Sequence, residues 1–149
     1  MADNTYSLTL ISRAARYLDR VAIISRGGTI SYAQLLEQSG CLASGLLNGR
    51  EDLQSQRVAF LVQRHSYPIV QWGIWRAGGI AVPLCEIHPP PELDYVIQDA
   101  DVSKVVTDER FLSILYPITR DRGIPLLRLD ELISSPMGTL PTEIRQFEK

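Results

Sequence analysis

A chain of 149 residues is long enough to form one domain with a hydrophobic core of its own. Its hydrophobic share of 45% and charged share of 21% are ordinary for a soluble globular protein. A formal net charge of −2 at pH 7 argues against nucleic acid or an anionic membrane surface as the partner.

The first third of the chain predicts a helix, a β-hairpin and a second helix. Apolar residues recur at helical spacing over residues 8–18. Two short strand-like runs over residues 21–31 flank the turn Arg26-Gly27-Gly28, which is typical of a hairpin. Ser31 and Gln34 then form a capping-box pattern, and the helix that they open should end at Asn48-Gly49.

From Val58 onward, strands and helices alternate. Continuous apolar runs predict strands that are buried on both faces, and helical periodicity predicts the segments between them. We expect strands at 58–62, 80–84, 104–107 and 124–127, and helices at 66–77, 92–100 and 111–118. Ser66 is the expected N-cap of the first of these helices and Gly78-Gly79 its end, and Pro117 should end the last one early.

This alternation predicts the fold class. Strands joined through helices by short connections form parallel βαβ units, so we expect an α/β fold with an open, mainly parallel sheet and helices on both faces. The hairpin should lie apart from this sheet or at its edge. The pattern stops at Ser134, so we expect residues 1–133 to form one α/β subdomain and residues 134–149 to be a linker or the start of a further part.

Cysteine, histidine and hydropathy patterns give little sign of other chemistry. Cys41 and Cys85 form no CxxC pair, and neither histidine lies near them at metal-ligand spacing, so we expect two core thiols and no metal site. A disulfide between them stays open. No run approaches the ~20 apolar residues of a membrane span. No basic segment followed by an apolar run marks a secretory signal, so the cytoplasm is the expected compartment.

Candidate binding residues are few. The segment Gln63-Arg64-His65-Ser66 follows a predicted strand, where a cation could meet an anion, but a solvated loop is the favoured interpretation. Neither Gly27-Gly28 nor Gly78-Gly79 fits a phosphate-binding loop. Glu86 and His88 could form an acid–base pair, although nothing else converges on them. We therefore assign no catalytic, no cofactor-binding and no metal-binding residue to this chain.

Four segments in register resemble the adenylate-forming enzymes. Thr29-Ile-Ser-Tyr-Ala-Gln-Leu35 resembles the segment that opens their second helix, and Arg57-Val-Ala-Phe-Leu61 resembles their "R-V-A/G" strand. Trp75-Arg-Ala-Gly-Gly-Ile-Ala-Val-Pro-Leu84 is similar to their "K-A-G-G-x-x-V-P-L", and Glu92-Leu-Asp-Tyr-Val-Ile-Gln-Asp99 to their "E-L-x-Y-x-I-x-D". The resemblance covers roughly residues 7–129 and marks the chain as similar to the N-terminal part of an AMP-forming acyl-CoA synthetase. Gln71-Trp72, Trp75, the run 78–84 and His88-Pro89 look most like the malonyl-CoA synthetases.

The resemblance implies the parent reaction. Such enzymes activate a carboxylic acid with ATP to an acyl-adenylate and pass the acyl group to a thiol, so the full-length family uses ATP, Mg²⁺ and CoA. The family's phosphate loop, "T-S-G-T-T-G-x-P-K-G", does not occur in this sequence, and neither lysine, Lys104 or Lys149, has Gly or Thr neighbours of that kind. We therefore expect the chain alone to bind no cofactor and to be inactive, because donors for the charge developing on the α-phosphate are missing.

Two other interpretations remain open. The chain could be a free-standing, non-enzymatic α/β module that binds a protein partner, or a small flavodoxin-like nucleotide binder whose loops lack phosphate-binding features. As partners we expect the remainder of the enzyme and, because the helix at 66–77 is apolar nearly all round, a copy of this chain.

Overall fold

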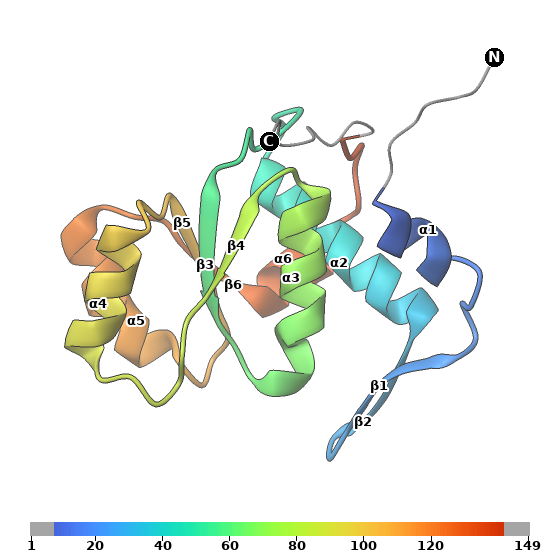
Figure 1. The fold of residues 1–149 in the computed structure, drawn as a ribbon, viewed down its shortest axis with the longest axis horizontal. Coiled ribbons are helices and arrows are strands. Elements are labelled where there is room, and N and C mark those ends of the chain that lie inside the picture. Colours follow the sequence, from blue (N-terminus) through green and yellow to red (C-terminus); the bar gives the residue numbers. More distant parts are fainter. Residues whose placement is uncertain (1–7, 142–149) are drawn as a thin grey trace.

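A computed structural model describes residues 8–141 as two layers of helices around a parallel sheet, with a small hairpin to one side (Figure 1). The strands are β1 Val21–Ser25, β2 Gly28–Ser31, β3 Arg57–Leu61, β4 Ile80–Pro83, β5 Lys104–Thr107 and β6 Leu126–Arg128. The helices are α1 Thr9–Ala14, α2 Tyr32–Leu47, the 3₁₀ turn η1 Arg64–Ser66, α3 Tyr67–Arg76, α4 Pro90–Asp99, α5 Leu112–Arg122 and α6 Leu129–Ser134. The predicted α/β class is confirmed.

The four-stranded sheet has the strand order β4-β3-β5-β6, and every neighbouring pair is parallel. The four strands agree with the predicted ones to within one or two residues. Hairpin strands β1 and β2 pair antiparallel in a sheet of their own, as expected. Their hairpin leads into α2, whose capping box is present: the Gln34 N–H donates to the Ser31 hydroxyl and the Ser31 N–H donates to the Gln34 side chain.

Alternate residues of β3 enter two separate cores. Val58 and Phe60 pack in a cluster with residues of α2, α3 and α6, while Ala59 and Leu61 pack in a second cluster with residues of α4 and α5. Both faces of the central strand are therefore covered by helices, which is why its sequence is a continuous apolar run. Figure 1 shows α4 and α5 on one side of the sheet and α2, α3 and α6 on the other.

Helix α3 ends just before Gly78-Gly79, as the sequence predicted. Gly78 has a positive φ of 79°, and its N–H donates to the carbonyl of Trp75, while the N–H of Gly79 donates to that of Ile74. These bonds use carbonyls that the end of the helix leaves free. Ser66 is the N-cap of α3, as predicted, but its side chain makes no capping bond, and η1 leads directly into the helix.

Two helices near the C-terminal end correct the sequence prediction. The helix α5 continues through Pro117 to Arg122 and ends at Gly123, which has a left-handed conformation. Pro117 and Ser113 are both exposed, and Pro117 has no N–H to donate to the Ser113 carbonyl. The six-residue α6 was not predicted; its Leu129 and Leu132 are buried against α2. The first helix is shorter than expected and ends at Ala14.

The helix α6 and the segment after it pass over α2, where small residues of α2 let them approach closely. The N–H of Gly138 donates to the Ser44 hydroxyl at 2.8 Å. A Cβ added at Gly40 would lie 2.2 Å from the Met137 sulfur, and one at Gly45 would lie 2.5 Å from Leu132. The proposed division at residue 134 stays a prediction, since residues 142–149 lie outside the described part of the chain.

Both cysteines are free thiols, with Cys41 buried and Cys85 exposed. The expectation of a core position is wrong for Cys85, because it follows β4 in the loop that leads to α4, outside both clusters. Within residues 8–141, no helix is long and apolar enough to cross a membrane.

Candidate functional site at the carboxyl edge of the sheet

The strand order creates a topological switch between β3 and β5. After β3 the chain turns to the face covered by α3, whereas after β5 it turns to the opposite face, covered by α5. The loops therefore diverge at the carboxyl ends of these neighbouring strands. In open α/β sheets, ligands bind in the crevice at this point, so the loops after β3, β4 and β5 form the candidate site.

Asp108 joins the two diverging loops. One carboxylate oxygen accepts the Gln63 N–H at 2.7 Å, and the other accepts the Arg110 N–H at 3.0 Å. The preceding residue, Thr107, is fully buried, and its hydroxyl donates to the Leu61 carbonyl at 3.0 Å. These hydrogen bonds hold the backbones of the loops after β3 and β5 together, and thereby position the side chains of the two loops.

A pocket of about 530 Å³ opens between these loops and the hairpin. It is lined by residues 63–65, Glu86 and Arg110 and, from the hairpin, by residues 23–26. The Glu86 carboxylate lies between two guanidinium groups, 3.5 Å from Arg64 and 3.8 Å from Arg110. With Arg26, the pocket holds three guanidinium groups against one carboxylate, so its charge favours an anion.

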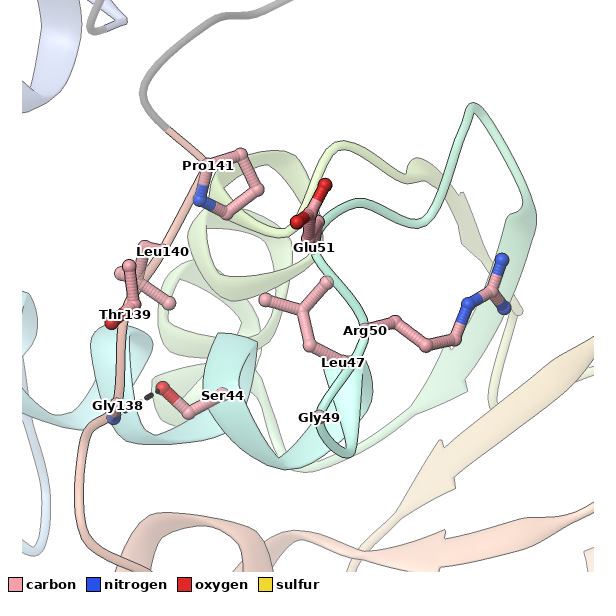
Figure 2. Close-up of a pocket in the computed structure, with 9 residues that line it drawn as sticks. All are labelled: Ser44, Leu47, Gly49, Arg50, Glu51, Gly138, Thr139, Leu140 and Pro141. Carbon is pink, nitrogen blue, oxygen red and sulfur yellow. Dashed lines mark hydrogen bonds between the residues drawn. The ribbon is translucent and has the colours of Figure 1, made fainter.

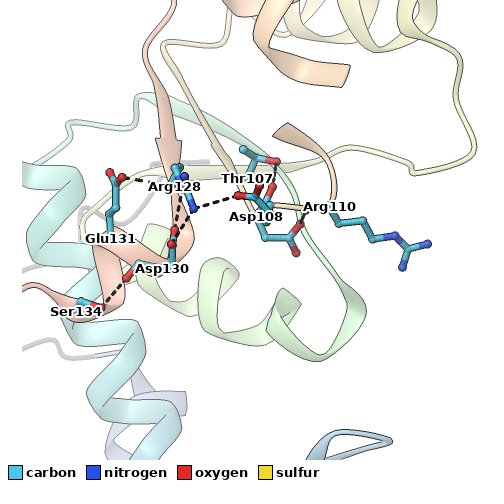
Figure 3. A network of polar contacts seen from close by, with 8 residues as sticks. Thr107, Asp108, Arg110, Arg128, Asp130, Glu131 and Ser134 are labelled. Carbon is cyan, nitrogen blue, oxygen red and sulfur yellow. Dashed lines mark hydrogen bonds and ion pairs between the residues drawn. The ribbon is translucent and has the colours of Figure 1, made fainter. Parts of the chain in front are cut away.

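A neighbouring arginine, Arg128, is held in ion pairs with nearby carboxylates. Arg128, at the end of β6, donates to both oxygens of Asp130, at 3.1 and 2.9 Å, and lies 3.0 Å from Glu109 (Figure 3). Hydrogen bonding from Arg128 lowers the pKa of the Asp130 carboxyl, and the same bond raises the pKa of Arg128. In Figure 3 the Arg110 side chain points away from this network, so it is not part of the same set of ion pairs.

A second pocket, of about 630 Å³, lies near the opposite edge of the sheet (Figure 2). It is lined by the end of α2, residues 49–51 and residues 138–141. Arg50 and Glu51 balance its charge, and the segment 49–51 precedes the amino end of β3. This position is away from the carboxyl edge, and the pocket borders the last residues that the structure describes, so it is a weaker candidate.

The residues singled out in the sequence are only partly brought together. Arg64 and His65 do line the carboxyl-edge pocket, but Glu86 pairs with arginines, while His88 lies 3.8 Å from Glu92. Glu86 and His88 therefore pair with other residues and do not form the acid–base pair considered from the sequence. No sequence pattern indicated the backbone contacts of Asp108, because the loop that it holds lies 45 residues earlier.

The described residues offer binding rather than bond-making chemistry. Within residues 8–141, no three His, Cys, Asp or Glu side chains are grouped so as to hold a metal ion. The pocket provides guanidinium donors and one imidazole, which can bind and orient an anion. The assignment of no catalytic, cofactor or metal residue stays a prediction.

The order of strands and the two helical layers define a doubly wound α/β domain with a pocket at the carboxyl edge of its sheet. The family model described as "AMP-binding enzyme" matches residues 10–137. The chain belongs to this family, as the resemblance of the four segments implied.

Similar proteins point to acid–CoA ligases. The chain is 39% identical over 142 residues to the mitochondrial malonate–CoA ligase ACSF3 of Mus musculus, covering 92% of this chain and 24% of the relative. It is 29% identical to a long-chain-fatty-acid–CoA ligase of Escherichia coli O157:H7, covering 91% of this chain and 25% of the relative. The crystal structure of ATP-bound MatB from Rhodopseudomonas palustris matches with a TM-score of 0.74 and 26% identity, covering 92% of this chain and 30% of that one. This chain thus spans about a quarter of the length of the curated relatives that it matches.

Proposed function

We propose that these residues are the N-terminal scaffold of an ATP-dependent, AMP-forming acid–thiol ligase that converts a carboxylic acid, ATP and CoA to acyl-CoA, AMP and diphosphate. Malonate is the proposed acid. The observation that carries the proposal is the match of nearly the whole chain to a protein named as a malonate–CoA ligase. The similarity to ATP-bound MatB supports ATP as the activating nucleotide.

The described residues support the proposed scaffold role. The capping box, the buried strands and the Gly78-Gly79 helix end shape the domain without presenting a nucleophile or a base. Within residues 8–141, no three carboxylate, thiol or imidazole side chains are grouped, so no residue there is assigned to the Mg²⁺ that would accompany ATP in the complete reaction. No step of the reaction is therefore assigned to these residues.

The first prediction is that the 149-residue chain alone is inactive and binds ATP–Mg²⁺ weakly. Its sequence holds no phosphate loop, so nothing stabilises charge at the reacting α-phosphate. Calorimetry should give a dissociation constant no tighter than about 100 μM. For comparison, a dissociation constant of ~1 mM corresponds to a binding free energy of about −4.1 kcal/mol. An assay of malonyl-CoA formation from malonate, ATP and CoA should show no product above the enzyme-free rate.

Tight ATP binding or turnover by the chain would contradict the scaffold role but would leave the family assignment unchanged.

The alternative of a free-standing module that binds a protein partner is decided by the coding sequence beyond Lys149. A phosphate loop encoded there supports the ligase, and a stop codon at that point supports the module. The compartment also stays open to test: the sequence predicted the cytoplasm, whereas the mouse relative is named as mitochondrial.

A further inference from the structure

We propose that the carboxyl-edge pocket is a binding site for the phosphate groups of a phosphorylated small molecule. Arg64 and Arg110 are its principal ligands, and Glu86 is an internal counter-ion that the phosphate displaces. This site goes beyond the scaffold role proposed above, and it rests on the geometry of this chain alone.

The charges of the pocket are unbalanced in favour of an anion. Three arginines, Arg26, Arg64 and Arg110, line it together with His65, and Glu86 is the one acidic side chain among the lining residues. Guanidinium groups present several N–H donors in a plane and bind phosphate through paired hydrogen bonds. The arginines come from three separate segments, namely the hairpin, the loop after β3 and the loop after β5, and so do not lie along one helix.

The pairing of Glu86 marks where the phosphate would lie. Its carboxylate is 33% exposed and lies 3.5 and 3.8 Å from the two guanidinium groups. Charge-assisted hydrogen bonds are usually about 2.7–2.9 Å long, so these two contacts are loose. The side chains of Arg64 and Arg110 are 94% and 60% exposed, which leaves most of their N–H donors available to a ligand.

Two other arginines of the chain, Arg128 and Arg122, contrast with this pair. Arg128 makes bonds of 2.9–3.1 Å to Asp130, and Arg122 makes bonds of 2.5 and 3.0 Å to Asp94. Those guanidinium groups are held tightly by carboxylates and serve the structure. Only loosely paired arginines can exchange their partner for an incoming phosphate at little cost.

The position and size of the pocket suit such a ligand. It lies at the carboxyl edge beside the β3–β5 switch, where open α/β sheets bind their ligands. Its volume of about 530 Å³ falls in the range of small-molecule sites. Because the donors are solvent-exposed, the affinity for a phosphate group alone should be modest, which agrees with the weak ATP binding predicted above.

The test is a titration of the 149-residue chain with inorganic diphosphate, followed by two-dimensional ¹H–¹⁵N NMR. The spectrum reports the folded state and the site of binding together. Shift changes should centre on the amides of residues 26, 64–65 and 110. Arg64→Gln and Arg110→Gln should each weaken binding about threefold, and Glu86→Gln should tighten it by a similar factor because the competing carboxylate is gone.

Arg50→Gln is the matched control, because it removes the same charge from an exposed arginine at the other pocket. It should leave the affinity unchanged. Equal weakening by all three arginine variants would show unspecific ionic attraction and overturn the site, as would a Glu86→Gln variant that binds no tighter. A spectrum without the dispersion of a folded protein would also count against it, because the site is proposed as a property of these residues.

ATP and CoA, as further probes, distinguish the sources of the phosphate. Shifts at the same amides with diphosphate and with both nucleotides assign the pocket to phosphate groups in general, as proposed. Shifts with one nucleotide and none with diphosphate would mean that the nucleoside is recognised instead, which contradicts the proposal. Failure of either kind leaves the ligase assignment intact, since that assignment rests on the family match and on the similarity to a malonate–CoA ligase.

Discussion

Gly78 shows how a single residue fixes the junction between α3 and β4. Its φ of 79° is left-handed, and a Cβ at this position would lie 2.2 Å from an Asp52 carboxylate oxygen. The loop that contains Asp52 also bonds directly to this turn, through Leu53 N–H to the Ala77 carbonyl. The turn therefore needs glycine for its conformation and for the space around it.

Gly78→Ala should lower the free energy of unfolding by about 2 kcal/mol or more, because strain and a steric clash add together. Gly49→Ala is the control: its φ is 84°, but nothing lies within 4 Å of an added Cβ. That variant should cost about 1 kcal/mol, the conformational part alone. Urea denaturation of both variants measures the difference, and equal losses would show that the Asp52 contact is relieved by a small shift.

Also at the scale of single residues, the sequence predicted those that interact with near neighbours in the chain and missed those that interact with residues far away in the chain. Ser31 and Gln34 are three positions apart, and Gly78-Gly79 stands directly between a helix and a strand, so their pattern is visible in the chain. Asp108 holds the Gln63 amide 45 residues away, and Glu86 lies between Arg64 and Arg110, which are brought together only by the parallel sheet. No spacing rule connects such residues.

At the scale of elements, α5 shows tertiary packing overriding a local rule. Pro117 was predicted to end the helix, yet α5 continues to Arg122. Leu115 and Ile118 are buried in the second core, and the Thr119 hydroxyl donates to the Leu115 carbonyl at 3.1 Å. Burial of the following turn thus outweighs the one backbone hydrogen bond that proline removes.

Pro117→Ala should therefore stabilise the protein, by about 2 kcal/mol. Alanine restores the N–H bond to the Ser113 carbonyl and removes a penalty of about 3 kcal/mol for proline inside a helix, offset by greater freedom of the unfolded chain. Thermal denaturation followed by circular dichroism measures the change. Pro90→Ala, in the first turn of α4, is the control and should give no gain, because no helical N–H bond is missing there.

The strands were the most predictable elements, and α6 the least. Each strand of the sheet is a short apolar run between turn residues, and burial on both faces makes such a run continuous. The six residues of α6 are too few to show a helical period, and the helix is defined by Leu129 and Leu132 packing on α2. A contact with a helix far earlier in the chain leaves no trace in local sequence.

At the scale of the whole molecule, the apolar α3 is largely accommodated within the domain. Ile69, Val70 and Ile74 are buried, while Trp72 and Trp75 are half-buried. Exposed apolar side chains lie elsewhere, in particular Ile24 on the hairpin at 81% and Ile87 after β4 at 83%. Within the described residues, β4 and β6 also end the sheet without a further strand.

We therefore keep the prediction that the isolated chain associates with itself, through exposed apolar side chains or through a sheet edge. Sedimentation velocity at micromolar concentrations should show a dimer or larger species. Ile24→Asp should reduce the association if the hairpin is the contact, whereas Glu109→Gln, a change at another exposed side chain, should not. A monomer at all concentrations would mean that the chain is self-sufficient.

The crossing of α2 by residues 137–138 has a consequence for biosynthesis. Ser44 receives its bond from Gly138, 94 residues later in the chain, and Leu132 and Met137 cover the neighbouring glycines of the same helix. A growing polypeptide on the ribosome therefore exposes this side of α2 until nearly all of the described residues have been translated. The domain reaches its final packing late in translation, and before then residues 32–47 are a segment on which a nascent chain of this protein is open to aggregation or chaperone binding.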